Sequence, residues 1–148
     1  MVESAADLEI LLVEDNPDHA ELTQQALREG SLANNIIWVT DGQEALDYLF
    51  RKGSYAGRLL PGLILLDIRL PKVNGVEVLK KVKEDEKLRV IPVIMLTTSD
   101  QNEEADRCYK LGANSFVTKP VIFEEFFEKV KSLKYYWILT DRGPISER

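Results

Sequence analysis

Five short apolar runs alternate with segments of helical periodicity along this chain of 148 residues. The runs lack the apolar–polar alternation of a strand with one solvent-facing side, so each predicts a strand buried on both faces. Strands of this kind occur in parallel sheets that helices cover on both sides. The pattern therefore predicts an α/β fold with three layers, in which the strands span residues 10–13, 34–39, 63–67, 90–96 and 114–118.

Capping and stop signals delimit five helices between and after these strands. Asn16 is a favourable N-cap and Pro17 suits the first helical position, whereas Gly30 and Gly112 are typical of helix ends. Apolar residues recur at helical spacing within the segments that these signals bound. The predicted helices cover residues 17–29, 40–50, 74–84, 101–111 and 121–136.

The charge balance and the single cysteine and histidine exclude several functions. The chain has 19 basic and 25 acidic residues, a net charge of −6 and no basic cluster, which argues against a nucleic-acid-binding surface. We find neither a membrane-spanning apolar run of about 20 residues nor a signal peptide, so we expect a cytoplasmic protein without a membrane segment. Cys108 and His19 have no expected partner, and we interpret both as packing or surface residues.

Polar side chains stand where four of the predicted strands end. Glu14 and Asp15 follow the first strand, Asp67 ends the third, Thr97 follows the fourth and Lys119 follows the fifth. In open parallel sheets, ligands bind outside the carboxyl ends of the strands, where the strand order reverses. If these strands are neighbours, three carboxylates, one hydroxyl and one ammonium group converge in one cleft.

This set of side chains has a definite chemistry. Three carboxylates so close together repel one another unless a cation lies between them. Their hard oxygen atoms suit Mg²⁺, and the Lys119 ammonium suits a phosphoryl oxygen. We interpret the cleft as a site for phosphoryl transfer to a carboxylate, with Asp67 as the nucleophile and Thr97 as a short hydrogen-bond donor.

Five motifs then occur in an order and spacing that resemble a known family. They are "LLVEDNPD", "DGQEAL", "LILLDIRLPKVNG", "VIPVIMLTTS" and "GANSFVTKP". The chain resembles, over residues 8–133, the receiver domain of two-component response regulators, the CheY-like family. This resemblance implies a flavodoxin-like (βα)5 sandwich whose parallel sheet has the strand order 2-1-3-4-5.

The resemblance also implies a role for the residues of the cleft. Asp67 would accept a phosphoryl group from the phosphohistidine of a sensor histidine kinase. Lys119 would precede a cis peptide bond to Pro120. The domain would be a phosphoacceptor with slow autodephosphorylation rather than an enzyme with a free substrate. The groups that would hold Mg²⁺ are Glu14, Asp15, Asp67 and the backbone carbonyl of Arg69.

Further residues around the cleft would control the response in such a receiver. Thr97 and Phe116 would form a switch pair, in which the hydroxyl moves to the phosphoryl group and the ring turns inward. The bulk of Thr98 should narrow access to the phosphoacceptor. The positions that tune the lifetime of the phosphoryl group would be Arg69, Thr98 and Ser99.

The predicted organisation is that of a single-domain receiver. We expect a flexible N-terminus at residues 1–7, a receiver domain at 8–136 and a tail at 137–148, without an output domain. The output would then be a change of partner or of self-association. The extended last helix with its aromatic–Trp end, the "TTS" after the fourth strand and the long loop before "LILLD" resemble the response regulators of bacterial and cyanobacterial phytochromes. A phytochrome-type histidine kinase would be the partner, although kinases with other sensors use similar receivers.

The last helix and the tail carry more aromatic side chains than one inward-facing stripe can use. They are Phe127, Tyr135, Tyr136 and Trp137. Aromatic residues are enriched in the cores of protein interfaces. We therefore expect a homodimer through the face built by the predicted helix 101–111, strand 114–118 and helix 121–136. The alternative is that the helix and the tail fold back on the domain.

Other interpretations share parts of the pattern. A flavodoxin would have the same fold, but it needs a hydroxyl- and glycine-rich phosphate loop where this chain has "EDNPD". A haloacid-dehalogenase-type phosphatase also uses Asp, Mg²⁺, Thr and Lys, yet its nucleophile follows the first strand as Asp-x-Asp, where this chain has Glu14, Asp15 and Asn16. A receiver-like interaction module that works without phosphorylation and a phosphate-shuttling intermediate in a multistep relay are the remaining alternatives.

Overall fold

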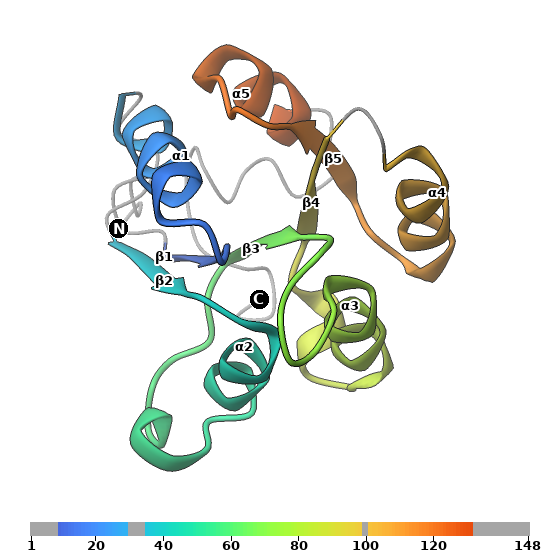
Figure 1. Ribbon diagram of the computed structural model, residues 1–148. Coiled ribbons are helices and arrows are strands. Elements are labelled where there is room, and N and C mark those ends of the chain that lie inside the picture. Colours follow the sequence, from blue (N-terminus) through green and yellow to red (C-terminus); the bar gives the residue numbers. More distant parts are fainter. Residues whose placement is uncertain (1–8, 30–34, 99–100, 132–148) are drawn as a thin grey trace.

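The computed structural model describes residues 9–29, 35–98 and 101–131 (Figure 1). Within these residues, five parallel strands form one sheet in the order β2-β1-β3-β4-β5. The strand order and the parallel pairing predicted for the fold are therefore confirmed. The strands are β1 (Glu9–Val13), β2 (Asn35–Val39), β3 (Leu63–Asp67), β4 (Val93–Thr97) and β5 (Ser115–Thr118).

Helices follow each of the strands, as the spacing of the apolar residues predicts. None of the helices in the described part of the chain is long and apolar enough to cross a membrane. Two short 3₁₀ helices, η2 (Gly53–Tyr55) and η3 (Leu88–Val90), lie in the connections before β3 and β4. The α-helices are α1 (Pro17–Glu29), α2 (Gly42–Leu49), α3 (Gly75–Glu84), α4 (Asn102–Leu111) and α5 (Phe123–Lys131).

The sheet is covered on both faces, with α1 and α5 on one side and α2, α3 and α4 on the other (Figure 1). Successive side chains of a strand point to opposite faces, so β1 sends Ile10 and Leu12 to the first side and Leu11 and Val13 to the second. All residues of β3 and β4 are buried. The carboxyl ends of the central strands are consequently anchored in two separate apolar layers.

The start of the fourth strand differs from the prediction. The apolar run at 90–96 was expected to be a strand throughout, but Val90 ends η3 and β4 begins only at Val93. Pro92 lies between them and has no N–H to donate to a neighbouring strand, although its carbonyl accepts from the backbone of Ile64 at 3.0 Å. The strand therefore includes Thr97 as its last residue.

The loop after β3 packs closely against the first turn of α3. Asn74 caps this helix by accepting a hydrogen bond from the Val76 N–H at 2.9 Å. The Gly75 N–H donates to the carbonyl of Ile68 at 2.8 Å. A Cβ atom on Gly75 would overlap the backbone oxygen of Asp67, so the close approach requires glycine. The end of β3 is thus held at a fixed place by the backbone of α3.

Candidate functional site

The chain leaves β1 through Glu14, whose backbone and side chain are both hydrogen-bonded. Its N–H donates to the Val39 carbonyl at 3.1 Å, and its own carbonyl accepts from the Trp38 indole N–H at 2.7 Å. The Asn16 N–H donates to Oε2 of the Glu14 carboxylate at 3.0 Å. Glu14 is fully buried. A buried carboxylate needs such partners, because an unpaired charge in the interior is costly.

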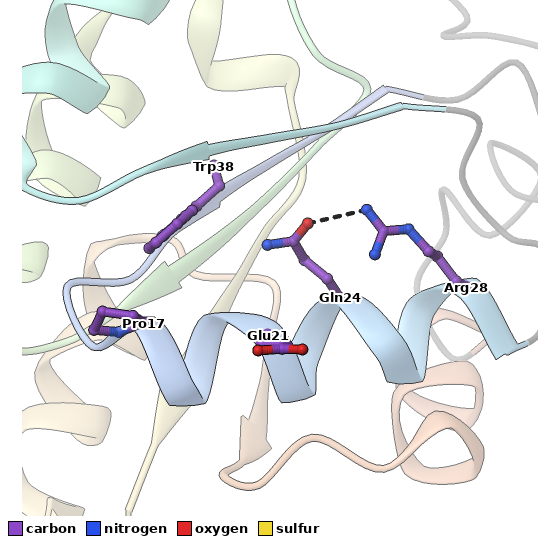
Figure 2. A pocket seen from close by; sticks show the side chains of 5 residues that line it. All are labelled: Pro17, Glu21, Gln24, Arg28 and Trp38. Atoms are coloured by element: carbon purple, nitrogen blue, oxygen red, sulfur yellow. Dashed lines mark hydrogen bonds between the residues drawn. The ribbon is translucent and has the colours of Figure 1, made fainter.

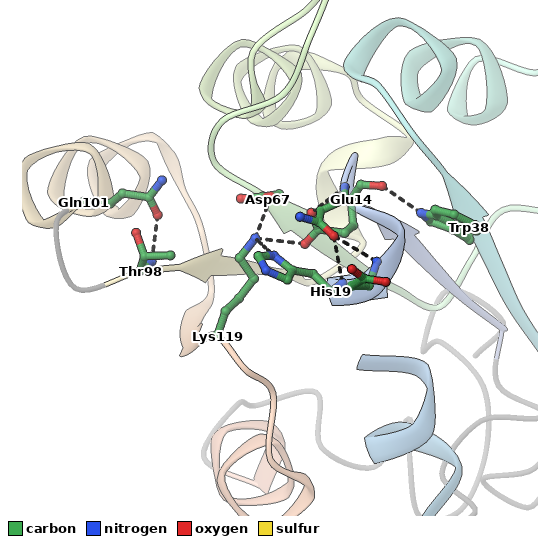
Figure 3. Close-up of polar contacts among 9 residues, drawn as sticks. Glu14, His19, Trp38, Asp67, Thr98, Gln101 and Lys119 are labelled. Atoms are coloured by element: carbon green, nitrogen blue, oxygen red, sulfur yellow. Dashed lines mark hydrogen bonds and ion pairs between the residues drawn. The ribbon is translucent and has the colours of Figure 1, made fainter. Parts of the chain in front are cut away.

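The following turn starts α1 and directs two side chains to the carboxyl edge of the sheet. Asn16 caps the helix through Oδ1, which accepts from the N–H groups of Asp18 at 2.9 Å and His19 at 3.1 Å. Asp15 lies on the exposed side of this turn. His19 lies in the first turn of the helix, over the same edge (Figure 3).

Lys119 connects the ends of β1, β3 and β5 at the centre of the site (Figure 3). Its Nζ atom lies 2.9 Å from Oε1 of Glu14 and 2.9 Å from Oδ2 of Asp67. Its backbone N–H donates to the Thr97 carbonyl at 2.8 Å, and its bond to Pro120 is cis, as the resemblance implies. Both carboxylates are buried, and the Lys119 side chain is 9% exposed. The ammonium therefore bridges two buried anions.

The electrostatics of this group are strongly coupled. Burial, followed by the charge of Asp67, raises the pKa of the Glu14 carboxyl from its ordinary 4.5 to about 7, despite opposing contributions from Lys119 and the Asn16 N–H. Burial alone would lower the pKa of Lys119, but its hydrogen bonds to Asp67 and Glu14 and their charges raise it overall. The two carboxylates thus share one cation and carry an excess of negative charge.

Three carboxylates could hold a metal ion at this edge. One oxygen of each of Glu14, Asp15 and Asp67 lies within 4.8 Å of the others. Hard carboxylate oxygens suit Mg²⁺, which takes one or two carboxylates and keeps several water molecules. The exposed position of Asp15 leaves one side of the group open to such waters. After burial, the charge of Asp67 contributes most to the raised pKa of Glu14, and a divalent cation would offset that charge, so the residues fit such an ion.

The other predicted residues are distributed around this centre. Thr97 is buried at the end of β4, and the register pairs Met95 with Phe116, so Thr97 and Phe116 face the same side of the sheet. Phe116 is half-buried, and its ring centroid lies 5.7 Å from that of Tyr109 on α4. The Thr98 N–H donates to Oε1 of Gln101 at 2.7 Å.

Two of the predicted positions need separate comment. The Arg69 side chain is exposed and forms an ion pair with Glu104 at 3.0 Å, from Nη2 to Oε1. Ser99 lies outside the described residues. The structure thus brings Glu14, Asp15, Asp67 and Lys119 together. Arg69 and Thr98, two of the positions expected to tune the site, lie on the loops that follow β3 and β4.

Two residues of the site were missed in the sequence. His19, interpreted as a packing or surface residue, has its Nδ1 atom 3.3 Å from Nζ of Lys119. An ammonium only donates, so Nδ1 must be the acceptor for this contact to be a hydrogen bond. Trp38 holds the carbonyl of Glu14. The capping signal at Asn16 could have indicated His19, because it predicts a helix that starts at the sheet edge and so places the residues of its first turn over that edge.

A groove lies between β2 and α1, beside the Trp38 ring (Figure 2). Within it, Nη2 of Arg28 donates to Oε1 of Gln24 at 3.1 Å. The groove is separate from the carboxylate group, but Trp38 borders the groove and also bonds to Glu14. Its lining residues are Pro17, Glu21, Gln24, Arg28 and Trp38.

The residues expected at a dimer surface are only partly described. Phe127 is half-buried on α5 and stacks on Phe123, with ring centroids 5.7 Å apart and an interplanar angle of 21°. Its ring also packs against the apolar layer under α1 and α5. Tyr135, Tyr136 and Trp137 lie outside the described residues.

Comparison with known proteins defines the family. A model of the response regulator receiver domain matches residues 10–131. The chain belongs to this family, whose members are signalling modules. The match lies within the receiver boundaries of 8–136 expected from the sequence.

Individual relatives agree with this assignment. The probable methanogenesis regulatory protein FilR2 of Methanothrix harundinacea (strain 6Ac) is 46% identical over 135 residues, which cover 91% of this chain and 86% of FilR2. Response regulator Rcp1 of Synechocystis sp. is 36% identical over 131 residues, 88% of this chain and 89% of Rcp1.

Solved structures give the same picture. The bacteriophytochrome response regulator AtBRR has a TM-score of 0.80 and 50% identity, over 88% of this chain and 94% of AtBRR. The Mn²⁺-bound form of Rcp1 has a TM-score of 0.76 and 34% identity, over 93% of this chain and 99% of Rcp1. The flavodoxin-like receiver fold is thus shared with a protein named as a bacteriophytochrome response regulator.

The raised pKa of Glu14 predicts how pH affects the metal-free protein. The native state binds more protons than the unfolded state between about pH 4.5 and pH 7, so the stabilising contribution of protonated Glu14 is complete below 4.5 and is lost as the pH rises through 7. Thermal unfolding in chelator should therefore show a larger loss of stability between about pH 5 and pH 8 in the wild type than in Glu14→Gln.

Saturating Mg²⁺ is the second arm of this experiment. A bound cation offsets the charge that raises the pKa, so the loss of stability toward pH 8 should become smaller in the wild type. Equal pH dependence of the wild type and Glu14→Gln in chelator would show that Glu14 does not titrate in this range.

Proposed function

We propose that this protein is a response regulator that accepts a phosphoryl group on Asp67 from the phosphohistidine of a histidine kinase, with Mg²⁺ as the cofactor. The observation that carries the proposal is the position of Lys119 Nζ, 2.9 Å from a carboxylate oxygen of both Glu14 and Asp67. A lysine placed in this way supplies a positive charge beside the group that would be modified. The fold and the family assignment support the same role.

The chemistry is a phosphoryl transfer between two protein side chains. An oxygen of the Asp67 carboxylate forms a bond to phosphorus, and the P–N bond of the phosphohistidine breaks. The electron pair of that bond stays on the imidazole nitrogen of the kinase. Lys119 holds Oδ2 of Asp67 and so orients the carboxylate for attack. Its ammonium then stabilises the added negative charge.

Glu14, Asp15, Asp67 and the backbone carbonyl of Arg69 are the groups that would hold Mg²⁺. The bound cation supplies positive charge that offsets the repulsion among the carboxylates and the phosphoryl oxygens. Support comes from the acidic group itself and from the Mn²⁺-bound form of Rcp1, a relative with 34% identity.

We further propose that Thr97 and Phe116 transmit the modification to the surface. The Thr97 hydroxyl moves toward the phosphoryl group, and the Phe116 ring turns inward. Both residues face the same side of the sheet, and Phe116 is only half-buried in the described conformation. Arg69, Thr98 and Ser99 are the positions that set the lifetime of the phosphoryl group.

The kinase partner is proposed to be of the phytochrome type. The support is the likeness to AtBRR, which is named a bacteriophytochrome response regulator and whose structure covers 88% of this chain. FilR2, at 46% identity, carries a name that refers to regulation of methanogenesis and not to a phytochrome. The interaction would use the carboxyl edge of the sheet, where the phosphohistidine must reach Asp67, a residue that is 4% exposed.

The central test is labelling at a defined residue. Acetyl phosphate with Mg²⁺ should add one phosphoryl group to the wild type, located at Asp67 by peptide mass spectrometry, and chelator should abolish the label. Asp67→Asn should remove the label, whereas Asp106→Asn on the exposed side of α4 should retain it. A label at another residue, or one that survives Asp67→Asn, would exclude the assignment.

The same reaction ranks the two acids after β1. Asp15→Asn should reduce the rate of phosphorylation at limiting Mg²⁺ by about tenfold or more, because the exposed Asp15 carboxylate is placed to bind the metal directly. Glu14→Gln should reduce the rate less. Glu14 already forms an ion pair with Lys119, and it would contact the metal mainly through a water molecule or by orienting that water. An equal or opposite order of the two rates would show that Glu14 is the principal ligand.

We also propose that the protein forms a homodimer through the face of α4, β5 and α5. Tyr109 supports this proposal, because it is an aromatic residue on α4 that is 64% exposed. Exposed aromatic side chains are frequent anchors of interfaces. Phe127 and Trp137 would contribute from the last helix and the tail.

Sedimentation analysis tests the dimer. The wild type should sediment as a dimer at micromolar concentration, and the double variant Phe127→Ala, Trp137→Ala should be shifted toward the monomer. Because Phe127 also packs on Phe123, Tyr109→Ala provides a second variant that removes no buried side chain. Leu59→Ala, at a residue 82% exposed outside this face, is the control. A monomeric wild type, or dimers in all variants, would count against this surface.

A further inference from the structure

An ion pair connects the two loops that follow the strands ending at Asp67 and Thr97. Arg69 lies two residues after Asp67, and its Nη2 atom is 3.0 Å from Oε1 of Glu104 in the first turn of α4. Both side chains are partly exposed, at 54% and 32%. The contact therefore joins the loop after β3 to the helix after β4 at the carboxyl edge of the sheet.

Apolar packing holds α4 less firmly than it holds α3. Cys108 is the one buried residue within α4, whereas α3 has five buried residues. Elements with few buried apolar contacts open locally at low cost. At the start of α4, the buried Gln101 side chain accepts a hydrogen bond from the Thr98 N–H at 2.7 Å (Figure 3). Polar contacts thus account for much of what holds the beginning of this helix next to the site.

We infer that the Arg69–Glu104 ion pair restricts access to Asp67, with Glu104 acting as a positioning residue through Arg69. This inference rests on the proposed function of Asp67 as phosphoacceptor. Asp67 is 4% exposed, and in the proposed opening the loop after β3 and the start of α4 move apart to admit a phosphodonor or a hydrolytic water molecule. The ion pair links these two segments and opposes that movement.

An access effect has a kinetic signature. Loss of the ion pair raises the population of the open form, in which the loop after β3 and the start of α4 have moved apart. Every reagent that must reach Asp67 then reaches it more often. Phosphorylation by a small donor and hydrolysis of the aspartyl phosphate should therefore accelerate by the same factor. An effect on the chemistry of one step would instead change one rate more than the other. The expected factor is about two- to fivefold, which is the range of an exposed ion pair.

The matched control is Glu103, the neighbouring acid in the first turn of α4. It is exposed and forms no ion pair with another residue of the described ranges. Glu103→Gln removes the same charge from the same turn as Glu104→Gln. A general electrostatic effect on an anionic donor would therefore accelerate both variants, whereas loss of the ion pair accelerates only Glu104→Gln.

The experiment measures two rates in five proteins. Phosphorylation by acetyl phosphate and decay of the purified phosphoprotein are followed for the wild type, Glu103→Gln, Glu104→Gln, Arg69→Met and the double variant Arg69→Met, Glu104→Gln. Glu104→Gln should increase both rates about two- to fivefold. The increase should occur in the wild-type background but not in the Arg69→Met background, because Glu104 then has no Arg69 side chain with which to pair.

Hydrogen exchange of the unphosphorylated protein gives an independent readout. Exchange in the loop after β3 and at the start of α4 should be faster in Glu104→Gln than in Glu103→Gln. If the wild type takes no label on Asp67, the proposed function fails while exchange still tests the ion pair. If the wild type is labelled but Glu104→Gln behaves like Glu103→Gln in both rates and in exchange, the access inference alone is overturned.

Discussion

The contact of Lys119 with Glu14 and Asp67 is the interaction on which the arrangement of the site depends. Two carboxylates buried side by side would repel each other, and without the Lys119 ammonium both would be buried charges without a counter-ion. The ammonium reaches both at 2.9 Å because β1, β3 and β5 all end at the same edge of a parallel sheet. The hydrogen bond from the Lys119 backbone N–H to the Thr97 carbonyl holds the end of β5 at that edge. Burial, followed by the charge of Asp67, raises the pKa of Glu14 despite its contact with the Lys119 ammonium.

The surroundings of the site differ in how firmly they are packed: β3, β4 and the start of α3 form a rigid part, and α4 forms a loosely packed flank. The strands β3 and β4 are buried throughout, and Gly75 brings the backbone of α3 directly against Asp67. These features hold Asp67, the proposed phosphoacceptor, in place. On the flank, α4 contributes one buried helical residue and relies on polar contacts through Gln101 and Glu104. The residues of the proposed phosphoryl transfer and the helix proposed to move are thus in different parts of the fold.

Local patterns allowed the parallel sheet and the central residues to be predicted, whereas the strand order was implied by the resemblance to response regulators. Doubly apolar strands require a parallel sheet, and the residues at their carboxyl ends then converge. The predicted start of β4 was wrong, because the apolar run was followed back past Pro92, which cannot donate a hydrogen bond to a neighbouring strand. His19, Trp38 and the partner of Arg69 were missed. Their contacts depend on the direction in which α1, β2 and α4 cross the sheet edge, which hydrophobic periodicity does not specify.

The missed histidine bears on how the site could accept a phosphoryl group. An ammonium has three N–H donors, and Lys119 lies within hydrogen-bond distance of three acceptors: Glu14, Asp67 and His19. A phosphoryl oxygen that binds Lys119 must displace one of them. Losing a carboxylate would leave a buried anion without its partner, which is strongly unfavourable. The imidazole is exposed and its contact is the longest of the three, at 3.3 Å. Its displacement leaves both carboxylates paired, so His19 marks the direction from which Lys119 can receive a new anion at the least cost.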